Sequence, residues 1–343
     1  MGHKVLVVAT SPNSRGGIAT VVKAFRETSM WKEFDCRWIE THIDKSKLHK
    51  FYKLTKALVE YIFLLCSYDI VHIHVSTAVS LKRKYIFYKL AKLYKRKVVI
   101  HLHCGSQLSD IWNAKYEEMF TNADMCLVLS NSIRDIITER IGRQDNVKVL
   151  YNPCPTIDRL LLGGTRQKTI LFAATLYKEK GYLDLVDAFA QVHKKHSDWK
   201  LLIAGNGSQE EGLTRVKRHT LGDSVVFLGW IKGEEKDAIF RSASIFCLPS
   251  YAEGFPMAVL DAWAYGIPVV TTPVGGIPDI VKDGVNGLLF TPGDVDVLAN
   301  HLNRLIENGD LRAKLSQESS LLVSSTFSIE CIANQLSDLY ANL

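Results

Sequence analysis

Short runs of apolar, often β-branched residues alternate along the whole chain with longer segments of helical periodicity. Each run has the length of a buried strand. The predicted strands are 4–9, 36–41, 70–74, 97–102, 124–129 and 146–151 in the first half, and 168–174, 199–204, 224–228, 244–248, 267–271 and 287–290 in the second. Strands that alternate with helices favour parallel sheets with right-handed crossovers. We therefore expect an α/β fold made of two doubly wound domains.

A break in this rhythm divides the chain near its middle, where Pro153, Pro155 and a pair of glycines interrupt the pattern. We predict an N-terminal domain over 1–165 and a C-terminal domain over 166–326. A last helix within 327–343 is expected to pack back on the N-terminal domain. Ligands bind beyond the carboxyl ends of the strands in open α/β sheets, so a cleft between the domains is the expected active site.

Composition narrows the class of protein. With 47% hydrophobic and 23% charged residues, the chain can form two cores, which excludes a disordered or fibrous protein. The longest apolar stretch, 57–66, is shorter than the roughly 20 residues of a membrane span, and the N-terminus has no signal-peptide pattern. The 7 cysteines are widely spaced without a CxxC pair, which argues against disulfides or a zinc site and for a cytoplasmic location.

Charge is unevenly distributed between the two halves. Residues 1–165 hold 25 Lys and Arg against 15 Asp and Glu, a net charge of +10, whereas residues 166–343 hold 17 against 21, a net charge of −4. The two values sum to the +6 of the whole chain. A basic half joined to an acidic half indicates that the two halves meet different partners.

The segment 250–266 has the most informative arrangement of polar residues. It follows an apolar strand, and Pro256 suits the first turn of a helix. Glu253 is then expected in the loop before this helix and Asp261 inside it, about 8–12 Å away by helical rise and loop length. This separation suits two carboxylates that hold opposite ends of one ligand. The N–H groups near 255–258 form a local positive end that could hold a hydroxyl or phosphate oxygen.

An acidic residue, Gly254-Phe255-Pro256 and a second acidic residue eight positions after the first resemble the signature of the retaining family 4 glycosyltransferases. Further segments match that family in the expected order. They are Gly16-Gly17, His101-Leu-His103, Asn152-Pro153, Leu176 with Glu179-Lys180-Gly181, Ala204-Gly205-Asn206-Gly207, Phe227-Leu228-Gly229 and Pro273-Val-Gly275-Gly276-Ile-Pro-Asp279. Each motif alone is weak, but the ordered set covers nearly the whole chain. The resemblance implies the GT-B architecture, two Rossmann-like domains of which the C-terminal one holds the nucleotide-sugar donor.

The resemblance also implies roles for individual residues. Lys180 matches the lysine that binds the donor diphosphate, where an ammonium stabilises the charge that gathers on the leaving group. Glu253 matches the carboxylate that contacts donor-sugar hydroxyls, and His103 matches the histidine near the donor sugar and β-phosphate. These three are the expected catalytic residues. The expected donor-binding residues are Gly16, Gly17, Thr175, Gly205, Gly207, Gly254, Phe255, Pro256, Asp261 and Gly276.

Two of these positions depart from the family pattern. Thr175 stands where the family usually has an arginine, so a neutral hydrogen bond replaces a charge-assisted one, a difference of about 1–2 kcal/mol. Asp261, the expected ribose-binding carboxylate, stands where the family usually has glutamate.

By resemblance, the expected activity is that of a retaining, metal-independent hexosyltransferase in bacterial polysaccharide or glycolipid synthesis. The substrates would be a nucleotide-diphosphate sugar and a glycan or lipid-linked acceptor, and no cofactor is expected. The acceptor would attack from the leaving-group side, with the β-phosphate assisting its deprotonation. The only Asp-x-Asp spacing, at Asp294 and Asp296, falls where a late helix begins and is interpreted as a helix cap.

A basic, aromatic segment over 81–97 predicts a further partner. It holds eight Lys and Arg with no acidic residue, and Ile86, Leu90 and Leu93 form an apolar stripe expected to face the core. A second run of lysines lies between 45 and 56. Such a surface fits docking on an anionic membrane, so the N-terminal domain is expected to bind the inner face of the cell membrane peripherally.

Three other functions compete with this interpretation. A GT-B-like nucleotide-sugar epimerase would need its own acid and base residues, which we do not find. A non-catalytic relative that binds a nucleotide or glycan is supported only by Thr175 and Asp261. A nucleic-acid-binding protein is disfavoured because no recognition motif accompanies the basic residues.

Overall fold

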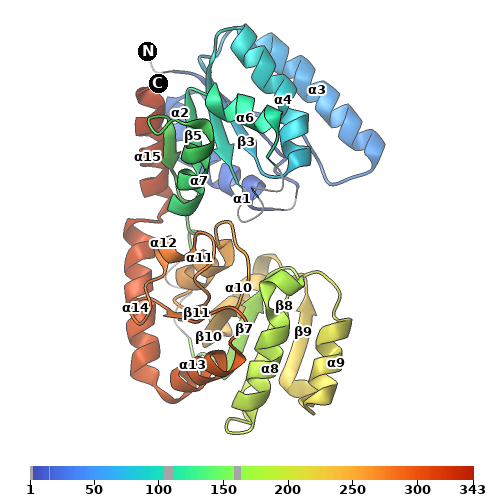
Figure 1. The fold of residues 1–343 in the computed structure, drawn as a ribbon, viewed down its shortest axis with the longest axis vertical. Coiled ribbons are helices and arrows are strands. Elements are labelled where there is room, and N and C mark those ends of the chain that lie inside the picture. The colour runs from blue at the N-terminus through green and yellow to red at the C-terminus, as the bar shows by residue number, and fades with distance from the viewer. Residues whose placement is uncertain (1–2, 15, 104–107, 109–111, 158–163) are drawn as a thin grey trace. The chain divides into compact units, whose positions relative to one another are not determined.

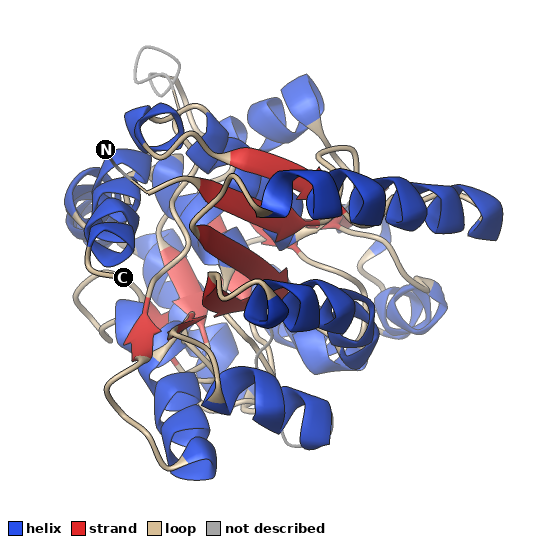
Figure 2. Cartoon of the chain, turned by 90° about the horizontal axis from the view of Figure 1, so that it is seen from above, coloured by secondary structure: helices blue, strands red, loops and turns tan. Residues whose placement is uncertain are grey.

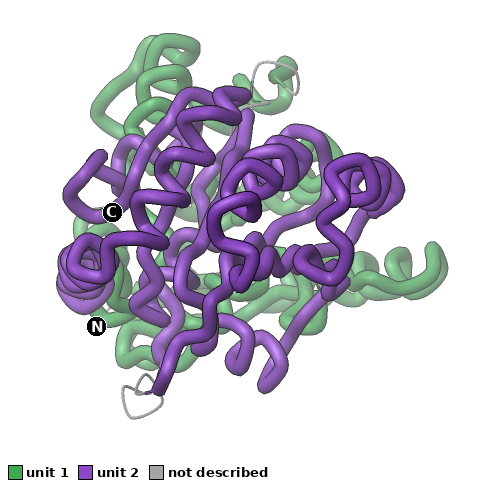
Figure 3. The backbone as a smooth tube through the Cα atoms, turned by 90° about the horizontal axis from the view of Figure 1, so that it is seen from below, with its two compact units in different colours: residues 1–153, 327–343 green, residues 154–326 purple. Residues whose placement is uncertain are grey.

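The computed structural model describes residues 3–343 except 15, 104–107, 109–111 and 158–163. The chain forms two compact units (Figure 3). Unit 1 comprises Met1–Pro153 and Phe327–Leu343, and unit 2 comprises Cys154–Thr326. The boundary therefore lies between Pro153 and Cys154, earlier than the residue 165 derived from the sequence.

Unit 1 contains a parallel sheet in the order β2-β1-β3-β4-β5-β6. Its strands are β1 Val5–Ala9, β2 Arg37–Glu40, β3 Ile70–Val75, β4 Lys97–Leu102, β5 Met125–Val128 and β6 Val147–Val149. Every strand predicted in this half is present. All residues of β1 and β3 are buried, as expected for strands that carry helices on both faces.

Helices cover both faces of this sheet, as the blue helices beside the red strands show (Figure 2). One face packs against α3 Lys47–Leu65, α4 Ala78–Leu93, α6 Ala114–Thr121 and α7 Asn131–Ile141. The opposite face packs against α1 Gly17–Arg26, α2 Ser29–Glu33 and α15 Ile329–Ala341. The last helix of the chain thus completes the core of unit 1 (Figure 1).

Unit 2 contains a parallel sheet in the order β12-β11-β10-β7-β8-β9. Its strands are β7 Thr169–Ala173, β8 Lys200–Ala204, β9 Val225–Gly229, β10 Ile245–Leu248, β11 Val269–Thr271 and β12 Leu288–Leu289. Its helices are α8 Tyr182–His193, α9 Glu210–Arg218, α10 Gly233–Ser242, α11 Met257–Ala264, α12 Ile277–Ile280, α13 Val295–Glu307 and α14 Gly309–Ser325, with short turns η2 Lys178–Lys180 and η3 Gly222–Ser224. The predicted strands of this half are also present. Asp294 caps α13 by accepting from the Val297 N–H at 3.0 Å, as interpreted from the sequence.

Of the apolar stripe predicted for α4, Leu90 packs against the core, but the other two positions are wrong. Ile86 is 44% exposed and Leu93 is 72% exposed. The buried face instead includes Leu81, Phe87, Tyr88 and Ala91, and it also contains the charged Lys84.

The buried face of α4 could not be recognised in the sequence because it contains Lys84, and a lysine normally indicates a solvent-facing position. Its ammonium is buried and donates to the His74 carbonyl and to Ser80 Oγ, the latter at 3.3 Å. Within the described residues, no helix combines the length and apolar character needed to cross a membrane.

Candidate functional site

Loops at the carboxyl edge of the unit 2 sheet bring together two of the predicted residues. Lys180 follows β7 and Glu253 follows β10, and these strands are neighbours in the sheet. Lys180 Nζ lies 2.6 Å from Glu253 Oε1 and 3.3 Å from the Ala252 carbonyl oxygen. The two side chains are 23% and 8% exposed. An ion pair therefore lies at the edge of the sheet where open α/β folds bind ligands.

The hydrogen bonds described for the Glu253 carboxylate all go to one of its two oxygens. Lys180 and Ser250 both donate to its Oε1 atom, Ser250 from 2.7 Å. In the described part of the chain no donor bonds to Oε2. This second oxygen keeps its capacity to accept hydrogen bonds, and the ligand class it suits is one that carries hydroxyl groups.

Two glycines without a Cβ atom allow neighbouring loops of the site to pack closely against each other. Gly181 has a φ of 68°, and a Cβ atom there would lie 1.9 Å from the Pro249 carbonyl oxygen. Gly275 has a φ of 58°, and its Cβ would lie 1.9 Å from the Glu253 carbonyl oxygen. Only glycine fits either position. Sequence reasoning quoted both residues in motifs but gave neither a role, although glycines beside the predicted charged residues were the available signal.

Gly276 and Gly254 meet through their backbones, as the Gly276 N–H donates to the Gly254 carbonyl at 3.0 Å. Phe255 is buried. Pro256 is the cap residue before α11 rather than part of its first turn, because its ψ of 79° is not helical. The Met257 N–H already donates to the Phe255 carbonyl at 3.0 Å, so the predicted group of open N–H donors is smaller than expected.

Gly205 and Gly207 pack against the loop that carries Thr175. A Cβ on Gly205 would lie 1.7 Å from the Ala174 carbonyl oxygen, and one on Gly207 would lie 2.8 Å from Leu176 Cβ. This close approach accounts for both glycines without a ligand. Thr175 itself is half-buried. A donor contact of these three residues remains a prediction.

Asp261 lies on α11 and is already paired. Its Oδ2 atom is 2.8 Å from Nζ of Lys236, which α10 supplies. Burial raises the pKa of Asp261, and the Lys236 ammonium opposes that rise. Sequence reasoning missed Lys236 because nothing in the local pattern of α10 distinguishes it from a surface lysine. A ribose hydroxyl bound to Asp261 would share the carboxylate with this lysine.

His103 lies in unit 1, directly after β4, and is joined to a second histidine. Its Nε2 atom is 2.8 Å from Nδ1 of His74, at the end of β3. Burial lowers the pKa of His103 well below the usual histidine range, and the neighbouring His101 and His72 lower it further. The imidazole is therefore neutral at pH 7 and retains a hydrogen-bonding capacity without charge. No motif or spacing had singled out His74.

The same strands carry a column of stacked histidines. The rings of His72 and His101 have centroids 5.3 Å apart and planes 12° apart, and those of His72 and His74 are 4.3 Å and 21° apart. Ring nitrogens of these three lie within 4.8 Å of one another. A metal ion binds an imidazole lone pair in the plane of the ring, so stacked faces favour packing of neutral rings over chelation.

Gly16 and Gly17 lie at the start of α1 in unit 1. Gly16 has a φ of 117°, which favours glycine. A Cβ on either residue would meet no described atom within 4 Å. Gly17 therefore has no steric reason within the described residues to be glycine. The predicted residues thus form two sets, with His103, Gly16 and Gly17 in unit 1 and the others in unit 2.

Comparisons with known proteins agree with this two-part organisation. The model of Glycosyltransferase Family 4 matches residues 1–156, and the model of Glycosyl transferases group 1 matches residues 159–321. The chain is 32% identical to the lipopolysaccharide 1,6-galactosyltransferase of Salmonella typhimurium over 56% of this chain and 55% of the relative. It is 30% identical to an uncharacterized glycosyltransferase of Haemophilus influenzae over 63% of this chain and 60% of that protein.

The alignments thus span little more than half the length of these two relatives. Among solved structures, Anabaena HepE in complex with UDP-glucose is similar with a TM-score of 0.77 at 20% identity, covering 99% of this chain and all of that one. The lipopolysaccharide outer core galactosyltransferase WaaB gives a TM-score of 0.71 at 22% identity over 99% and 100% of the two chains. These similarities establish the fold. With matches that cover both units, the chain belongs to the glycosyl transferases group 1 family and has the GT-B fold of two Rossmann-like domains.

Proposed function

We propose that this protein transfers a sugar from a nucleotide-diphosphate sugar to a hydroxyl group of a glycan or lipid-linked acceptor in polysaccharide or glycolipid synthesis. The observation that carries the proposal is the Lys180–Glu253 pair at the carboxyl edge of the unit 2 sheet. The family membership and the galactosyltransferase name of the Salmonella relative support it. The UDP-glucose in the HepE structure supports a nucleotide sugar as the donor.

Lys180 is proposed to bind the donor diphosphate. An ammonium has three N–H donors, and the Glu253 carboxylate and Ala252 carbonyl occupy two of them. The third can donate to a phosphate oxygen. As the bond between the sugar and the diphosphate breaks, the phosphate gathers negative charge, and this hydrogen bond strengthens. Glu253 would orient the donor sugar by accepting a hydroxyl hydrogen bond at Oε2.

We further propose a retaining, metal-independent reaction of the hexosyltransferase type. The acceptor oxygen forms its bond to the anomeric carbon on the face that the diphosphate leaves, and the leaving oxygen takes the bonding electron pair. The acceptor proton passes to a β-phosphate oxygen. Lys180 would meet the charge of the leaving diphosphate, and the neutral imidazole of His103 would hydrogen-bond near the donor sugar. No cofactor is proposed.

The remaining donor contacts are proposed from the family resemblance. Asp261 would bind the ribose together with Lys236, and the open space at Gly17 would admit the diphosphate or the acceptor. The other residues proposed to line the donor site are Gly16, Thr175, Gly205, Gly207, Gly254, Phe255, Pro256 and Gly276.

Peripheral docking on the inner face of the cell membrane is proposed from α3 rather than from α4. The aromatic residues Phe87 and Tyr88 of α4 are buried in the core. Along α3, by contrast, Leu48, Phe51 and Phe63 are 81%, 72% and 80% exposed, and exposed lysines lie among them. Figure 1 shows this long helix extending from the rest of unit 1. Exposed apolar residues with lysines favour an anionic membrane surface.

The test is thermal melting with a panel of UDP-, GDP-, ADP- and dTDP-sugars, followed by a transfer assay with the sugar that binds. A ligand at 100 times its Kd adds about 2.7 kcal/mol of stability, which raises the Tm by several degrees. We expect one nucleotide to stabilise the wild type, and Lys180→Ala to abolish the shift. Lys178→Ala is the matched control because that lysine is 75% exposed on the same turn.

Transfer that persists in the presence of EDTA is expected from the metal-independent mechanism. Nucleotide-sugar binding without transfer to any acceptor would favour the non-catalytic alternative that Thr175 and Asp261 suggest. Absence of both binding and transfer would overturn the proposal.

A further inference from the structure

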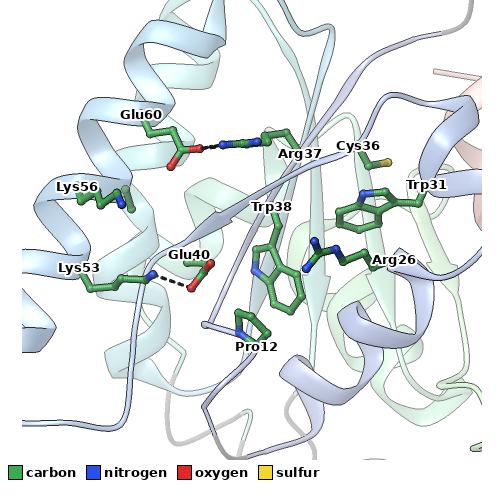
Figure 4. A pocket seen from close by; sticks show the side chains of 11 residues that line it. Pro12, Arg26, Trp31, Cys36, Arg37, Trp38, Glu40, Lys53, Lys56 and Glu60 are labelled. Atoms are coloured by element: carbon green, nitrogen blue, oxygen red, sulfur yellow. Dashed lines mark hydrogen bonds and ion pairs between the residues drawn. The ribbon is translucent and has the colours of Figure 1, made fainter.

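A pocket of about 340 Å³ lies in unit 1 at the edge strand β2. Its walls come from α1, α2, β2 and α3 and from the loop that follows β1. The volume falls in the range of about 300–1,000 Å³ that small-ligand sites occupy. None of its lining residues belongs to the predicted donor site. Figure 4 shows the side chains around it.

Two tryptophans form one side of the pocket. Trp31 on α2 and Trp38 on β2 are both half-buried (Figure 4). Trp38 Nε1 donates to the Thr10 carbonyl at 3.1 Å, so the orientation of this indole is fixed before any ligand arrives. An indole presents a flat apolar face. The C–H groups on one face of a sugar ring pack on such a surface, while its hydroxyls point outward to polar neighbours.

Among the described residues, two of the four cations that line the pocket form no ion pair. Lys53 Nζ lies 2.7 Å from Glu40 Oε2. Arg37 donates to Glu60 Oε1 from Nε and Nη2, at 3.0 and 2.7 Å.

Arg26 and Lys56 also line the pocket, on α1 and α3, and neither forms an ion pair among the described residues. Four cations against two carboxylates give the pocket an excess of two positive charges. An anionic ligand would complete this arrangement.

We propose that this pocket binds an acidic sugar unit, one that carries a carboxylate or phosphate group. Arg26 and Lys56 would donate to the acidic group, and Glu40 and Glu60 would accept from ring hydroxyls. The sugar ring would pack against the indoles. The lining offers few aliphatic side chains, so it does not suit an acyl chain.

The position of the pocket indicates which part of a glycan it would hold. Pro12 lies in the loop between β1 and the Gly16-Gly17 segment, and Glu40 ends β2, so the pocket reaches the carboxyl edge of the sheet. The acidic sugar would be a unit of the acceptor glycan next to the reacting end, rather than the reacting sugar itself. This inference rests on the proposed function because it takes the acceptor to be a glycan.

The experiment measures binding by titration calorimetry to a panel of acidic saccharides. The panel contains trigalacturonate, a glucuronate-containing tetrasaccharide and glucose 6-phosphate, with the methyl ester of trigalacturonate as a neutral match and inorganic phosphate as an ion alone. The proteins are the wild type, Arg26→Ala/Lys56→Ala, and the control Lys23→Ala/Lys50→Ala. The control removes the same charge from exposed positions on the same two helices outside the pocket.

We expect at least one acidic saccharide to bind the wild type and the control equally. Its Kd should rise about tenfold or more in Arg26→Ala/Lys56→Ala, because the loss of even one of the two charge-assisted contacts implies a change of that size. The methyl ester should bind the wild type about tenfold more weakly than trigalacturonate if the latter is the ligand. Both results would support the inference.

Four outcomes would overturn it: no acidic saccharide binds, both double variants bind alike, the methyl ester binds as tightly as its acid, or phosphate alone binds as tightly as the saccharides. Binding to anionic phospholipid vesicles that depends on Arg26 and Lys56, without saccharide binding, would assign the pocket to a lipid headgroup instead. The nucleotide-sugar melting test on the same wild-type sample separates the two proposals. If the donor still binds while the saccharides do not, this inference fails and the proposed function stands.

Discussion

At the residue scale, one oxygen of the Glu253 carboxylate is the shared hydrogen-bond acceptor of the candidate site in unit 2. Glu253 Oε1 accepts from both Lys180 and Ser250, and the carboxylate is almost fully buried. Removal of one partner from a buried ion pair leaves an uncompensated charge and is strongly destabilising. A substitution at Lys180 therefore changes both the stability of unit 2 and its chemistry, and the two effects need separate measurements.

For Lys180→Ala we expect transfer to fall about 100- to 1,000-fold, the range for removal of one donor to a developing anion. The variant should also unfold more easily, because the Glu253 carboxylate is left with Ser250 as its partner. Lys180→Ala/Glu253→Gln should recover stability without recovering transfer. Steady-state kinetics and urea unfolding measure the two effects. Near-normal turnover in the single variant would contradict the role of Lys180.

Gly17→Ala separates catalysis from folding. An added Cβ would meet no described atom, and alanine is favoured over glycine in a helix by up to about 1 kcal/mol. We expect an unchanged or higher Tm with reduced transfer, because the methyl group would occupy the space proposed for substrate. Thr20→Ala, at an exposed position one turn later, is the control. Full activity in Gly17→Ala would remove this residue from the site.

At the element scale, the strands could be predicted because their apolar runs are continuous and β-branched. The buried face of α4 could not be predicted, because it contains Lys84, whose amine is buried beside the His74 carbonyl and the Ser80 hydroxyl. The residues of the candidate site also differed in how far the sequence could predict them. The family resemblance pointed to Lys180 and Glu253, and Ser250, which also donates to Glu253, lies only three residues before it. Lys236 and His74, the partners of Asp261 and His103, lie on other elements and had no signal in the sequence.

The burial of Lys84 on α4 predicts that the free energy of unfolding depends on pH. Burial lowers the pKa of its ammonium well below 10.5, the value of an unfolded lysine. Between the lowered value and 10.5 the unfolded chain binds more protons than the native one, so this residue makes stability increase with pH in that window. The slope reaches at most about 1.4 kcal/mol per pH unit.

Urea unfolding at pH 7.5, 8.5 and 9.5 measures this slope. Lys84→Met should lack this component, because methionine has no proton to lose. The control is Lys82→Met, at an exposed position on the same helix, and it should keep the wild-type slope. Parallel pH profiles for Lys84→Met and the wild type would show that the amine does not titrate in this range.

At the scale of the whole molecule, unit 1 is discontinuous in the sequence. Its core needs α15, in which Tyr340 packs on Phe34 with ring centroids 5.2 Å apart and bonds through its hydroxyl to His72 Nδ1. The sequence analysis predicted that a last helix within 327–343 packs back on the N-terminal domain. The residues that this helix contacts, Phe34 and His72, could not be derived from the sequence.

Tyr340→Phe is expected to destabilise unit 1 by about 1–3 kcal/mol, because His72 Nδ1 loses its partner while it stays buried. Hydrogen exchange read by mass spectrometry should show faster exchange in β3 and β4. Unit 2 should keep its nucleotide-sugar affinity. Equal loss of protection in both units would mean that they unfold as one cooperative body.

The late position of α15 also sets an order of events during translation. The ribosome synthesises all of unit 2 after Pro153 and before Phe327. At about 5–20 residues per second this takes roughly 10–30 s. Throughout that interval the nascent N-terminal sheet lacks the helix whose Tyr340 bonds to His72. Unit 2 can be complete before unit 1, although its sequence begins later.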